Sequence, residues 1–170
     1  MLAIEESRKL SLSNLPSLTL FTGVDQGQYD IMKTQVLKQI GYDSADLNFA
    51  YFDMKEVDYK SLELELVSLP FFADEKIVIL DHFLDITTAK KRYLNDDELK
   101  AFEDYLENPV PSSKLVIFAE GKLDSKRRLV KLLKRDATVF EAIEPKEQEI
   151  RAYFQKWAQE QGLSFEGKAF

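Results

Sequence analysis

The segment Ser68-Leu69-Pro70-Phe71-Phe72 stands before a charged turn, Asp74-Glu75-Lys76, and the apolar run Ile77-Val78-Ile79-Leu80. Pro70 fixes its own φ angle and disfavours the helical conformation at Leu69, so a preceding helix must end near this point. The aliphatic run that follows is typical of a strand buried on both faces. The large apolar side chains at the boundary either fill the core or project as a protein-binding wedge.

Composition limits the classes of function. The chain has 170 residues, a net charge of -7, no cysteine and one histidine, His82. These features exclude disulfides and thiolate nucleophiles, and they argue against a histidine-based metal site or a Ser-His-Asp triad. The acidic charge argues against nucleic-acid binding over the whole surface, though not by a local basic patch. With no secretory signal and no apolar run of membrane-spanning length, we expect a cytoplasmic protein without membrane contact.

Four other segments have the character of buried strands. With residues 76–80 they make five, the others being 18–21, 47–52, 115–118 and 137–140. Helical periodicity separates them, at residues 26–40, 58–69, 95–106 and 124–135. Buried strands that alternate with helices predict an α/β domain with a parallel five-stranded sheet flanked by helices.

Several helix details follow from local signals. Tyr29, Met32, Val36 and Ile40 form one predicted buried stripe, and Tyr59, Leu62, Leu66 and Leu69 form another. Asp58 and Asp124 are the expected N-caps of their helices, and Asn95 with Glu98 has the spacing of a capping box. We expect a short amphipathic helix within residues 1–14, and a loop or short helix over residues 81–93.

The C-terminal part differs from the rest. Glu144-Pro145 opens a further helix that carries Ile150, Phe154 and Trp157 on one face and ends at Gly162. Little sequence remains to cover these side chains. We therefore expect an α/β domain over residues 1–142, and over 143–170 the first helix of a helical domain that is cut short.

The first strand–helix junction tests for a nucleotide site. A P-loop requires a second glycine five residues after the first, then Lys and Ser or Thr. Counting from Gly23, those positions hold Gln28, Tyr29 and Asp30. No lysine is present to neutralise phosphates, and Asp25 and Asp30 would repel them. The junction therefore has the location of a phosphate site without its chemistry, and we expect no bound cofactor.

Two other features invite a functional interpretation. Asp81 ends the third strand as a Walker B aspartate would, but without the lysine loop we expect no metal there, and we interpret His82 as a strand-end side chain that faces loop or solvent. A basic stretch surrounds the helix at 124–135, with Lys126, Arg127, Arg128 and Lys131 as its candidate contact residues. This stretch is either a solvated helix face or a patch for nucleic acid or a partner protein. No pair of residues has the pattern of a catalytic acid and base.

Taken together, the motifs resemble a known family. In order along the chain they are Gly23, Ser68-Leu69-Pro70-Phe71-Phe72, Tyr105-Leu106-Glu107-Asn108-Pro109, Lys122-Leu123-Asp124 and the segment from Glu147 to Gly162. Over nearly its whole length the chain resembles the delta subunit of the bacterial DNA polymerase III clamp loader. The resemblance implies a degenerate P-loop, AAA+-like domain that does not hydrolyse ATP, followed in the full chain by a helical lid-like domain and a collar domain.

The resemblance also implies a role for the opening segment. Leu69, Pro70, Phe71 and Phe72 would bind the beta sliding clamp and help to open it for loading onto primed DNA. The implied partners are this clamp and the ATPase-type and delta-prime-type loader subunits, with DNA contacted only in the assembled loader. No catalytic residue, cofactor or metal is implied, although the holoenzyme is a DNA-directed DNA polymerase, a nucleotidyltransferase.

Two alternatives of other classes remain open at the level of sequence. One is an NTPase with an atypical phosphate loop. The other is a nucleic-acid-binding module that uses the basic helix.

Overall fold

A computed structural model gives the fold and describes residues 2–70, 74–144 and 146–162. Of the predicted clamp-binding segment, Leu69 and Pro70 are described, whereas Phe71 and Phe72 lie outside the described residues, as does Pro145. The strands are β1 (Leu18–Gly23), β2 (Phe49–Asp53), β3 (Lys76–Asp81), β4 (Ser113–Glu120) and β5 (Thr138–Ala142). The helices are α1 (Ala3–Ser7), α2 (Gln26–Gln39), α3 (Tyr59–Val67), the 3-10 turn η1 (Leu84–Ile86), α4 (Asp96–Glu107), α5 (Arg128–Asp136) and α6 (Glu147–Glu160).

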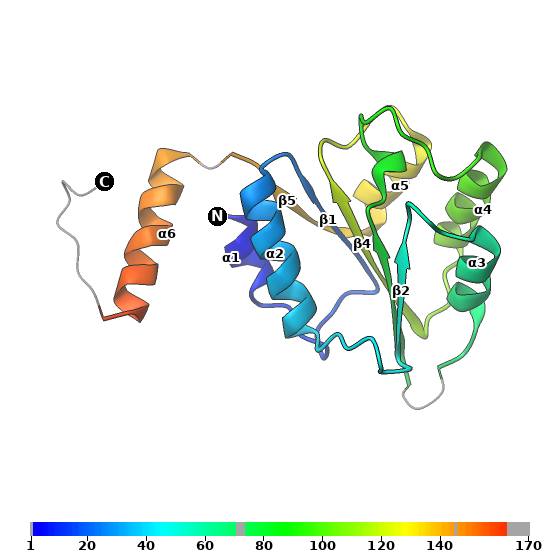
Figure 1. Cartoon of the computed structure of the whole chain (residues 1–170), viewed down its shortest axis with the longest axis horizontal. Helices are drawn as coiled ribbons and strands as arrows, with labels where there is room; N and C mark the ends of the chain where they lie inside the picture. Colours follow the sequence, from blue (N-terminus) through cyan, green and yellow to red (C-terminus); the bar gives the residue numbers. More distant parts are fainter. Residues whose placement is uncertain (1, 71–73, 145, 163–170) are drawn as a thin grey trace.

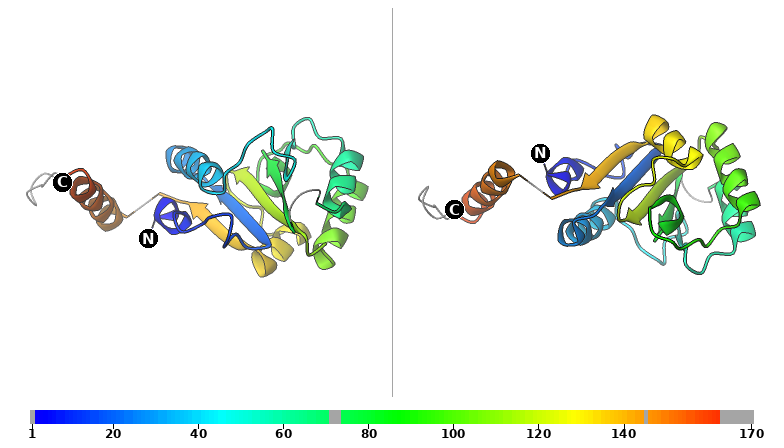
Figure 2. Two further views of the ribbon diagram at one scale, coloured as in Figure 1. Left: turned by 90° about the horizontal axis from the view of Figure 1, so that it is seen from below. Right: turned by 90° about the horizontal axis from the view of Figure 1, so that it is seen from above.

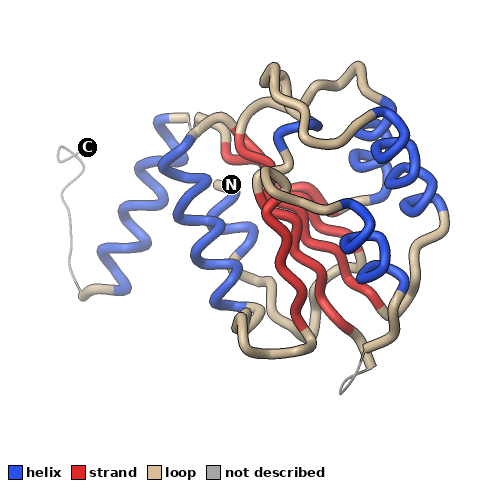
Figure 3. Tube along the Cα trace, turned by 45° about the vertical axis from the view of Figure 1, so that its right-hand side comes forward, coloured by secondary structure: helices blue, strands red, loops and turns tan. Residues whose placement is uncertain are grey.

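The five strands form one parallel sheet in the order β2-β3-β4-β1-β5. Helices α1 and α2 cover one face, and α3, α4 and α5 cover the other (Figures 1 and 2). Figure 3 shows the sheet between these two helical layers. The predicted α/β fold with a parallel five-stranded sheet is therefore confirmed.

The core on the α1–α2 face is built around aromatic rings. Phe21 of β1 stacks against Phe118 of β4 at 5.0 Å and against Phe140 of β5 at 5.2 Å. The predicted stripe of α2 is buried and packs with these rings; it consists of Tyr29, Met32, Val36 and Ile40. The spacing of apolar residues in the sequence thus identified the inner face of this helix.

The core on the opposite face joins three helices to the sheet. Its helical members are buried pairs from α3, α4 and α5, namely Leu62 and Leu66, Phe102 and Leu106, and Leu129 and Leu133. They pack on strand residues that alternate with those of the first core, such as Val78 and Leu80. Each interior strand is thus covered on both sides, which explains its continuous apolar sequence.

Two predicted helix details are wrong. Helix α3 ends at Val67, and Leu69 lies beyond it with 75% of its surface exposed, so Leu69 does not share the buried face of Leu62 and Leu66. Helix α5 begins only at Arg128, and Asp124 is not its N-cap. The Asp124 carboxylate instead accepts hydrogen bonds from the Lys126 amide (3.2 Å) and Arg127 Nε (3.3 Å), which close a turn before the helix. Both errors arise where local turn chemistry stops a helical pattern.

Other signals at helix starts hold. Asn95 and Glu98 form the predicted capping box through bonds of 2.8 and 2.9 Å. Asp58 stands at the N-cap of α3, although its carboxylate accepts from the Ser61 hydroxyl rather than from a backbone amide. The segment at 81–93 contains the short helix η1, whose Asp85 and Ile86 are buried.

Helix α6 follows the last strand and lies at the end of the molecule next to α1 (Figures 1 and 2). Tyr153 packs at the edge of the α1–α2 core, with the Arg8 guanidinium 5.8 Å from its ring centre. Ile150, Phe154 and Trp157 are 38%, 46% and 43% exposed. A second domain over 143–170 stays a prediction. Among the residues described, no helix is long and apolar enough to cross a membrane.

Candidate functional site

The carboxyl edge of the sheet contains a topological switch point. Neighbouring strands β1 and β4 continue into α2 and α5, which lie on opposite faces. In open α/β sheets, ligands bind in the crevice that such a divergence creates. The residues that surround this point therefore test whether the chain has a nucleotide site.

The loop after β1 is closed by the chain itself. Gly23 has a φ of +131°, and a Cβ at this position would lie 2.3 Å from the carbonyl oxygen of Ala142. The Asp25 carboxylate accepts from the Gln28 amide at 3.1 Å and so uses one of the free donors at the start of α2. The Gln28 side chain accepts from the Ala3 amide (3.1 Å) and donates to the Ile143 carbonyl (2.9 Å). The N-terminus of α2 is where a phosphate would bind in a nucleotide site. Here it is capped by the Asp25 carboxylate, and Gln28 forms hydrogen bonds with distant segments of the same chain.

An ion pair between the partly buried Lys33 and the buried Asp81 lies at the end of β3. Lys33 of α2 donates to both carboxylate oxygens of Asp81 at 2.7 Å, and the Tyr51 hydroxyl also donates to Asp81. Burial opposes ionisation of Asp81, but the hydrogen bonds from Lys33 and Tyr51 outweigh it and lower its pKa. The pKa of the Tyr51 hydroxyl is raised, by burial first and then by its bond to Asp81. The ammonium of Lys33 therefore supplies the positive charge that Asp81 faces.

His82 links this ion pair to β4. His82 has a φ of +55°, and its Nδ1 lies 2.9 Å from Glu120 Oε1 while its Nε2 lies 3.5 Å from Asp81 Oδ2. Ligand atoms of Asp81, His82 and Glu120 fall within 4.8 Å of one another, close enough to share a cation. Each carboxylate already faces a side-chain donor, however, so we assign no metal to this group. The His82 side chain remains 30% exposed at the end of β3, as its sequence interpretation allowed, but its ring also contacts two acidic side chains that the sequence did not predict.

Sequence reasoning named Asp81 and His82 but missed Tyr51, Glu120 and, most importantly, Lys33. Lys33 lies 48 positions before Asp81, and no motif spacing connects the two. Only the packing of α2 against the sheet brings the ammonium to the end of β3. A partial signal existed, because Lys33 directly follows Met32 on a helix whose inner stripe could be identified.

The predicted clamp-binding segment begins at the opposite, amino edge of the sheet, between α3 and β3. Ser68 has extended backbone angles, Leu69 is 75% exposed and Pro70 is partly exposed. Leu69 is more exposed than any other large apolar residue for which the structure gives a value. Of the two interpretations that the sequence left open, Leu69 fits a projecting side chain and not a core position.

A buried lysine fixes the base of this segment. Lys76, 3% exposed, donates to the Glu65 carbonyl and the Ser68 hydroxyl and forms an ion pair with the Glu65 carboxylate at 3.1 Å. The Leu66 carbonyl accepts from Ser113 (3.2 Å) and Tyr105 (3.3 Å). The last carbonyls of α3 are therefore capped by side chains, and the two ends of the segment, Ser68 and Lys76, are in contact.

An apolar helix surface adjoins the same segment. Leu64 and Val67, one turn apart on α3, are 69% and 51% exposed. With Lys60 and Glu63 they line a shallow groove of about 360 Å³. Leu64, Val67 and Leu69 thus form an exposed apolar strip that runs toward Pro70.

The residues of the predicted basic patch differ in whether they form ion pairs. Arg128 faces Glu103 and Glu107 at 3.7 Å each, and Arg127 pairs with Asp124 at 3.3 Å. Lys126 and Lys131 are exposed, and no ion pair with them occurs in the described part of the chain. The basic character of α5 is therefore partly neutralised by α4.

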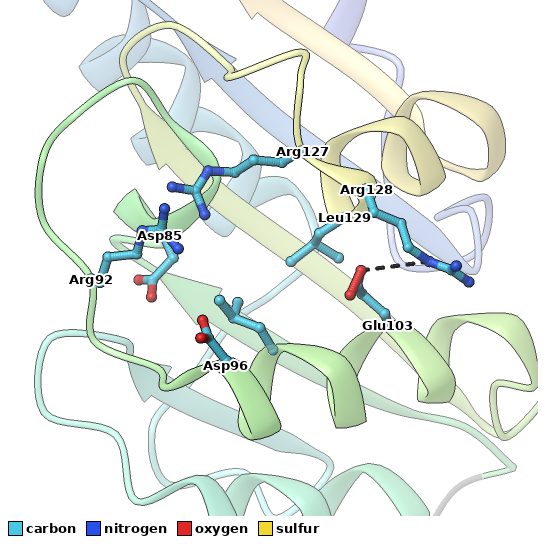
Figure 4. A pocket seen from close by; sticks show the side chains of 8 residues that line it. Asp85, Arg92, Asp96, Glu103, Arg127, Arg128 and Leu129 are labelled. Atoms are coloured by element: carbon cyan, nitrogen blue, oxygen red, sulfur yellow. Dashed lines mark ion pairs between the residues drawn. The ribbon is translucent and has the colours of Figure 1, made fainter.

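A cavity of about 230 Å³ separates the start of α5 from the loop before α4 (Figure 4). Arg92 and Arg127 point into it from the two sides, toward the buried Asp85. Asp85 Oδ2 accepts from the amides of Tyr93 and Leu94 at 2.9 Å and so holds the loop in place. The lining mixes both signs of charge, a pattern that selects no single ligand.

Comparison with known proteins gives a consistent result. Residues 20–143 match the sequence profile of the family described as DNA polymerase III, delta subunit. The DNA polymerase III subunit delta of Bacillus subtilis is 28% identical over 106 residues, which are 62% of this chain and 30% of that protein.

Solved structures share the fold. A Bacillus subtilis DNA clamp loader delta protein has a TM-score of 0.72 at 22% identity, over 93% of this chain and 47% of that one. A DNA polymerase III gamma subunit-related protein of Thermotoga maritima has a TM-score of 0.50 at 15% identity, over 93% of this chain and 52% of that one. The chain thus spans about half or less of the relatives that it matches.

Proposed function

Since this chain belongs to the DNA polymerase III delta subunit family, we propose that it is the clamp-binding domain of a clamp-loader delta subunit. Its role is to bind the beta sliding clamp and open the ring for loading onto primed DNA in the bacterial cytoplasm. It acts with ATPase-type and delta-prime-type subunits. The wedge that performs this role consists of Leu69, Pro70, Phe71 and Phe72.

The exposed Leu69 at the end of α3 carries this proposal. An apolar side chain that is 75% exposed on a boundary held by Lys76 gains free energy when a partner covers it. Burial of a leucine and two phenylalanine side chains contributes a few kcal/mol at ~25 cal/mol per Å² of apolar area. Pro70 lowers the conformational entropy lost on binding, because its φ angle is already restricted.

Clamp opening requires only that the wedge bind one state of the ring better than the other. A clamp that alternates between closed and open forms shifts toward the form with the higher affinity for the wedge. The free energy for opening then comes from differential binding and not from chemistry in this chain.

The closed carboxyl edge supports a role without catalysis. Asp25 and Gln28 fill the start of α2, and Lys33 neutralises Asp81. We therefore expect no binding of ATP with magnesium in a calorimetric titration of the chain. Micromolar affinity for ATP would favour the alternative of an NTPase with an atypical phosphate loop.

The test is a binding measurement with a purified sliding clamp immobilised on a sensor surface. The double variant Phe71→Ala plus Phe72→Ala, and separately Leu69→Ala, should lose most of the affinity, because aromatic and leucine anchors dominate such interfaces. The matched control is Ile31→Ala, which removes an apolar side chain that is 53% exposed on the outer face of α2.

Circular dichroism and urea unfolding establish that each variant is folded. A folded double variant that binds the clamp as well as the wild type would show that the wedge is assigned wrongly. Equal losses for Ile31→Ala and Leu69→Ala would contradict a localised contact.

A further inference from the structure

Strand β2 is an edge of the sheet that lacks the usual protection of exposed edges. It pairs with β3, and no described strand lies beyond it (Figure 1). Edge strands are commonly protected from self-association by lysine and other charged side chains, by proline or by a bulge. The sequence of β2 is Phe-Ala-Tyr-Phe-Asp, whose single charge stands at the end. By contrast, the other edge strand, β5, carries the exposed Glu141 within it.

The outer edge of β2 presents the backbone groups of alternate residues. The Asn48 carbonyl and the Met54 amide bond to β3, at 2.9 and 2.8 Å. Backbone groups alternate in direction along a strand that pairs on one side. The amides and carbonyls of Phe49, Tyr51 and Asp53 therefore point away from β3.

Two of these six outward groups are already used within the chain. The Phe49 amide donates to the Asp46 carbonyl at 3.1 Å, and the Asp53 carbonyl accepts from the Glu56 amide at 3.0 Å. The other four are the Phe49 carbonyl, both groups of Tyr51 and the Asp53 amide. Within the described ranges these four have no hydrogen-bond partner. The free groups are thus arranged symmetrically about Tyr51.

This symmetry matches a second copy of the same strand. In an antiparallel pair centred on Tyr51, the two Tyr51 residues exchange two hydrogen bonds, and each Phe49 carbonyl accepts from the Asp53 amide of the other copy. The Phe49 amide would face the Asp53 carbonyl of the other copy, and both are already engaged in their own chains. An antiparallel peptide of another sequence would leave unpaired the two groups that face these positions, at a cost in free energy. The pattern therefore favours a second copy as the partner.

The side chains of β2 also fit this pairing. Tyr51 is 41% exposed and would lie opposite Tyr51 of the second copy, as a cross-strand aromatic pair. Its hydroxyl donates to Asp81, and its ring centre lies 5.7 Å from that of Tyr42. These contacts hold the ring in place before association and so reduce the entropy lost. On the other face of the sheet, Ala50 would lie opposite the larger Phe52 of the second copy.

We propose that the chain forms a two-fold symmetric dimer in which two β2 strands pair antiparallel about Tyr51 and join the two sheets into one. A single pair of short strands buries less than about 1,000 Å², so the dimer is weak and depends on concentration. This contact goes beyond clamp binding and uses neither Leu69 nor the apolar strip on α3.

The first test is sedimentation velocity of the chain at rising concentration, from micromolar to submillimolar. The sedimentation coefficient should increase toward that of a dimer. Tyr51→Lys places two like charges directly opposite each other and should weaken association roughly tenfold or more. The matched control, Tyr51→Phe, lacks only the hydroxyl and should associate nearly as the wild type does. Circular dichroism and urea unfolding establish that both variants are folded.

The second test locates the contact by cross-linking. The chain has no cysteine, so a single introduced thiol reports on one position. With a short bis-maleimide linker, Tyr51→Cys should cross-link to itself in high yield at concentrations where the dimer forms. Ile31→Cys, at a position that is 53% exposed on α2, is the control and should cross-link little.

A chain that stays monomeric at submillimolar concentration would overturn the proposal. So would undiminished association of a folded Tyr51→Lys, or equal cross-linking of Ile31→Cys and Tyr51→Cys. Clamp binding of Tyr51→Lys, measured at concentrations below dimer formation, should equal that of the wild type. This result separates the dimer from the test of the wedge.

Discussion

The ammonium nitrogen of Lys33 lies 2.7 Å from both carboxylate oxygens of Asp81 and joins α2 to the end of β3. Asp81 is 1% exposed, and Lys33 also lies 5.6 Å from the centre of the Phe118 ring. The ion pair occupies the part of the fold where related α/β proteins bind ligands. The same ion pair therefore stabilises the domain and fills the place where a nucleotide would bind, in agreement with the role without catalysis that we propose.

Removal of the lysine should destabilise the domain. The substitution Lys33→Met leaves the Asp81 carboxylate buried without its cation, and we expect the free energy of unfolding to fall by roughly 3 kcal/mol. Urea unfolding at neutral pH measures it. The exposed Lys38→Met on the same helix is the control, and Lys33→Met combined with Asp81→Asn should recover much of the loss. A single variant as stable as the wild type would contradict this account.

The same ion pair should make stability depend on pH in a defined direction. The pKa of Asp81 is lowered in the folded protein, so the unfolded chain binds its proton at a higher pH. The stabilisation from Asp81 is therefore complete above about pH 5 and is lost as pH falls through the ordinary carboxyl range toward the lower folded value. The difference in unfolding free energy between the wild type and Asp81→Asn should shrink over this interval. A difference that stays constant down to pH 3 would contradict the lowered pKa.

Lys76 should hold the end of α3 in place. The substitution Lys76→Met leaves the Glu65 carbonyl and the Ser68 hydroxyl without their donor, and we expect a loss of roughly 2 kcal/mol in stability. Clamp affinity should also fall, because Ser68 is no longer fixed. The control is Lys114→Met, which removes an ion pair of 3.5 Å between a lysine that is 14% exposed and the exposed Glu75, and it should cost roughly 1 kcal/mol or less. Equal effects of the two substitutions on thermal unfolding would show that Lys76 has no special role.

Replacement by alanine should have opposite effects on stability at Gly23 and Gly27, the two glycines of the junction between β1 and α2. A Cβ at Gly23 would meet the Ala142 backbone at 2.3 Å in a left-handed conformation, so Gly23→Ala should destabilise by roughly 3 kcal/mol or prevent folding. At Gly27, in the first turn of α2, the nearest contact is 3.8 Å away, and alanine should stabilise by up to about 1 kcal/mol. Thermal unfolding distinguishes them, and a tolerated Gly23→Ala would show that the close approach can relax.

The apolar strip on α3 should contribute to clamp binding but not to folding. Leu64→Ser combined with Val67→Ser removes two exposed side chains, so stability should change by roughly 0.5 kcal/mol or less. Clamp affinity should fall several-fold, less than for the double phenylalanine variant. Unchanged affinity on the sensor surface would confine the contact to the segment after Val67.

Sequence patterns predicted the sheet because each strand is marked by a run of apolar residues within a few positions. The buried run Ile77-Val78-Ile79-Leu80 and the capping box at Asn95 both depend on neighbours within a few residues. The errors occurred where turn chemistry overrode periodicity, at Leu69 and at Asp124. The ion pair between Lys33 and Asp81 depends on how α2 packs against the sheet, and no residue spacing in the sequence predicts that packing.

The sequence by itself determined the α/β class, the missing P-loop chemistry and the apolar segment at Pro70, because these depend on residue type and local spacing. Only the tertiary structure decided that Leu69 is exposed, that Lys33 neutralises Asp81 and that the Thr88 amide donates to the Lys122 carbonyl. The physical reason is the same in each case. Exposure, charge pairing and contacts between loops are set by which distant segments the sheet brings together.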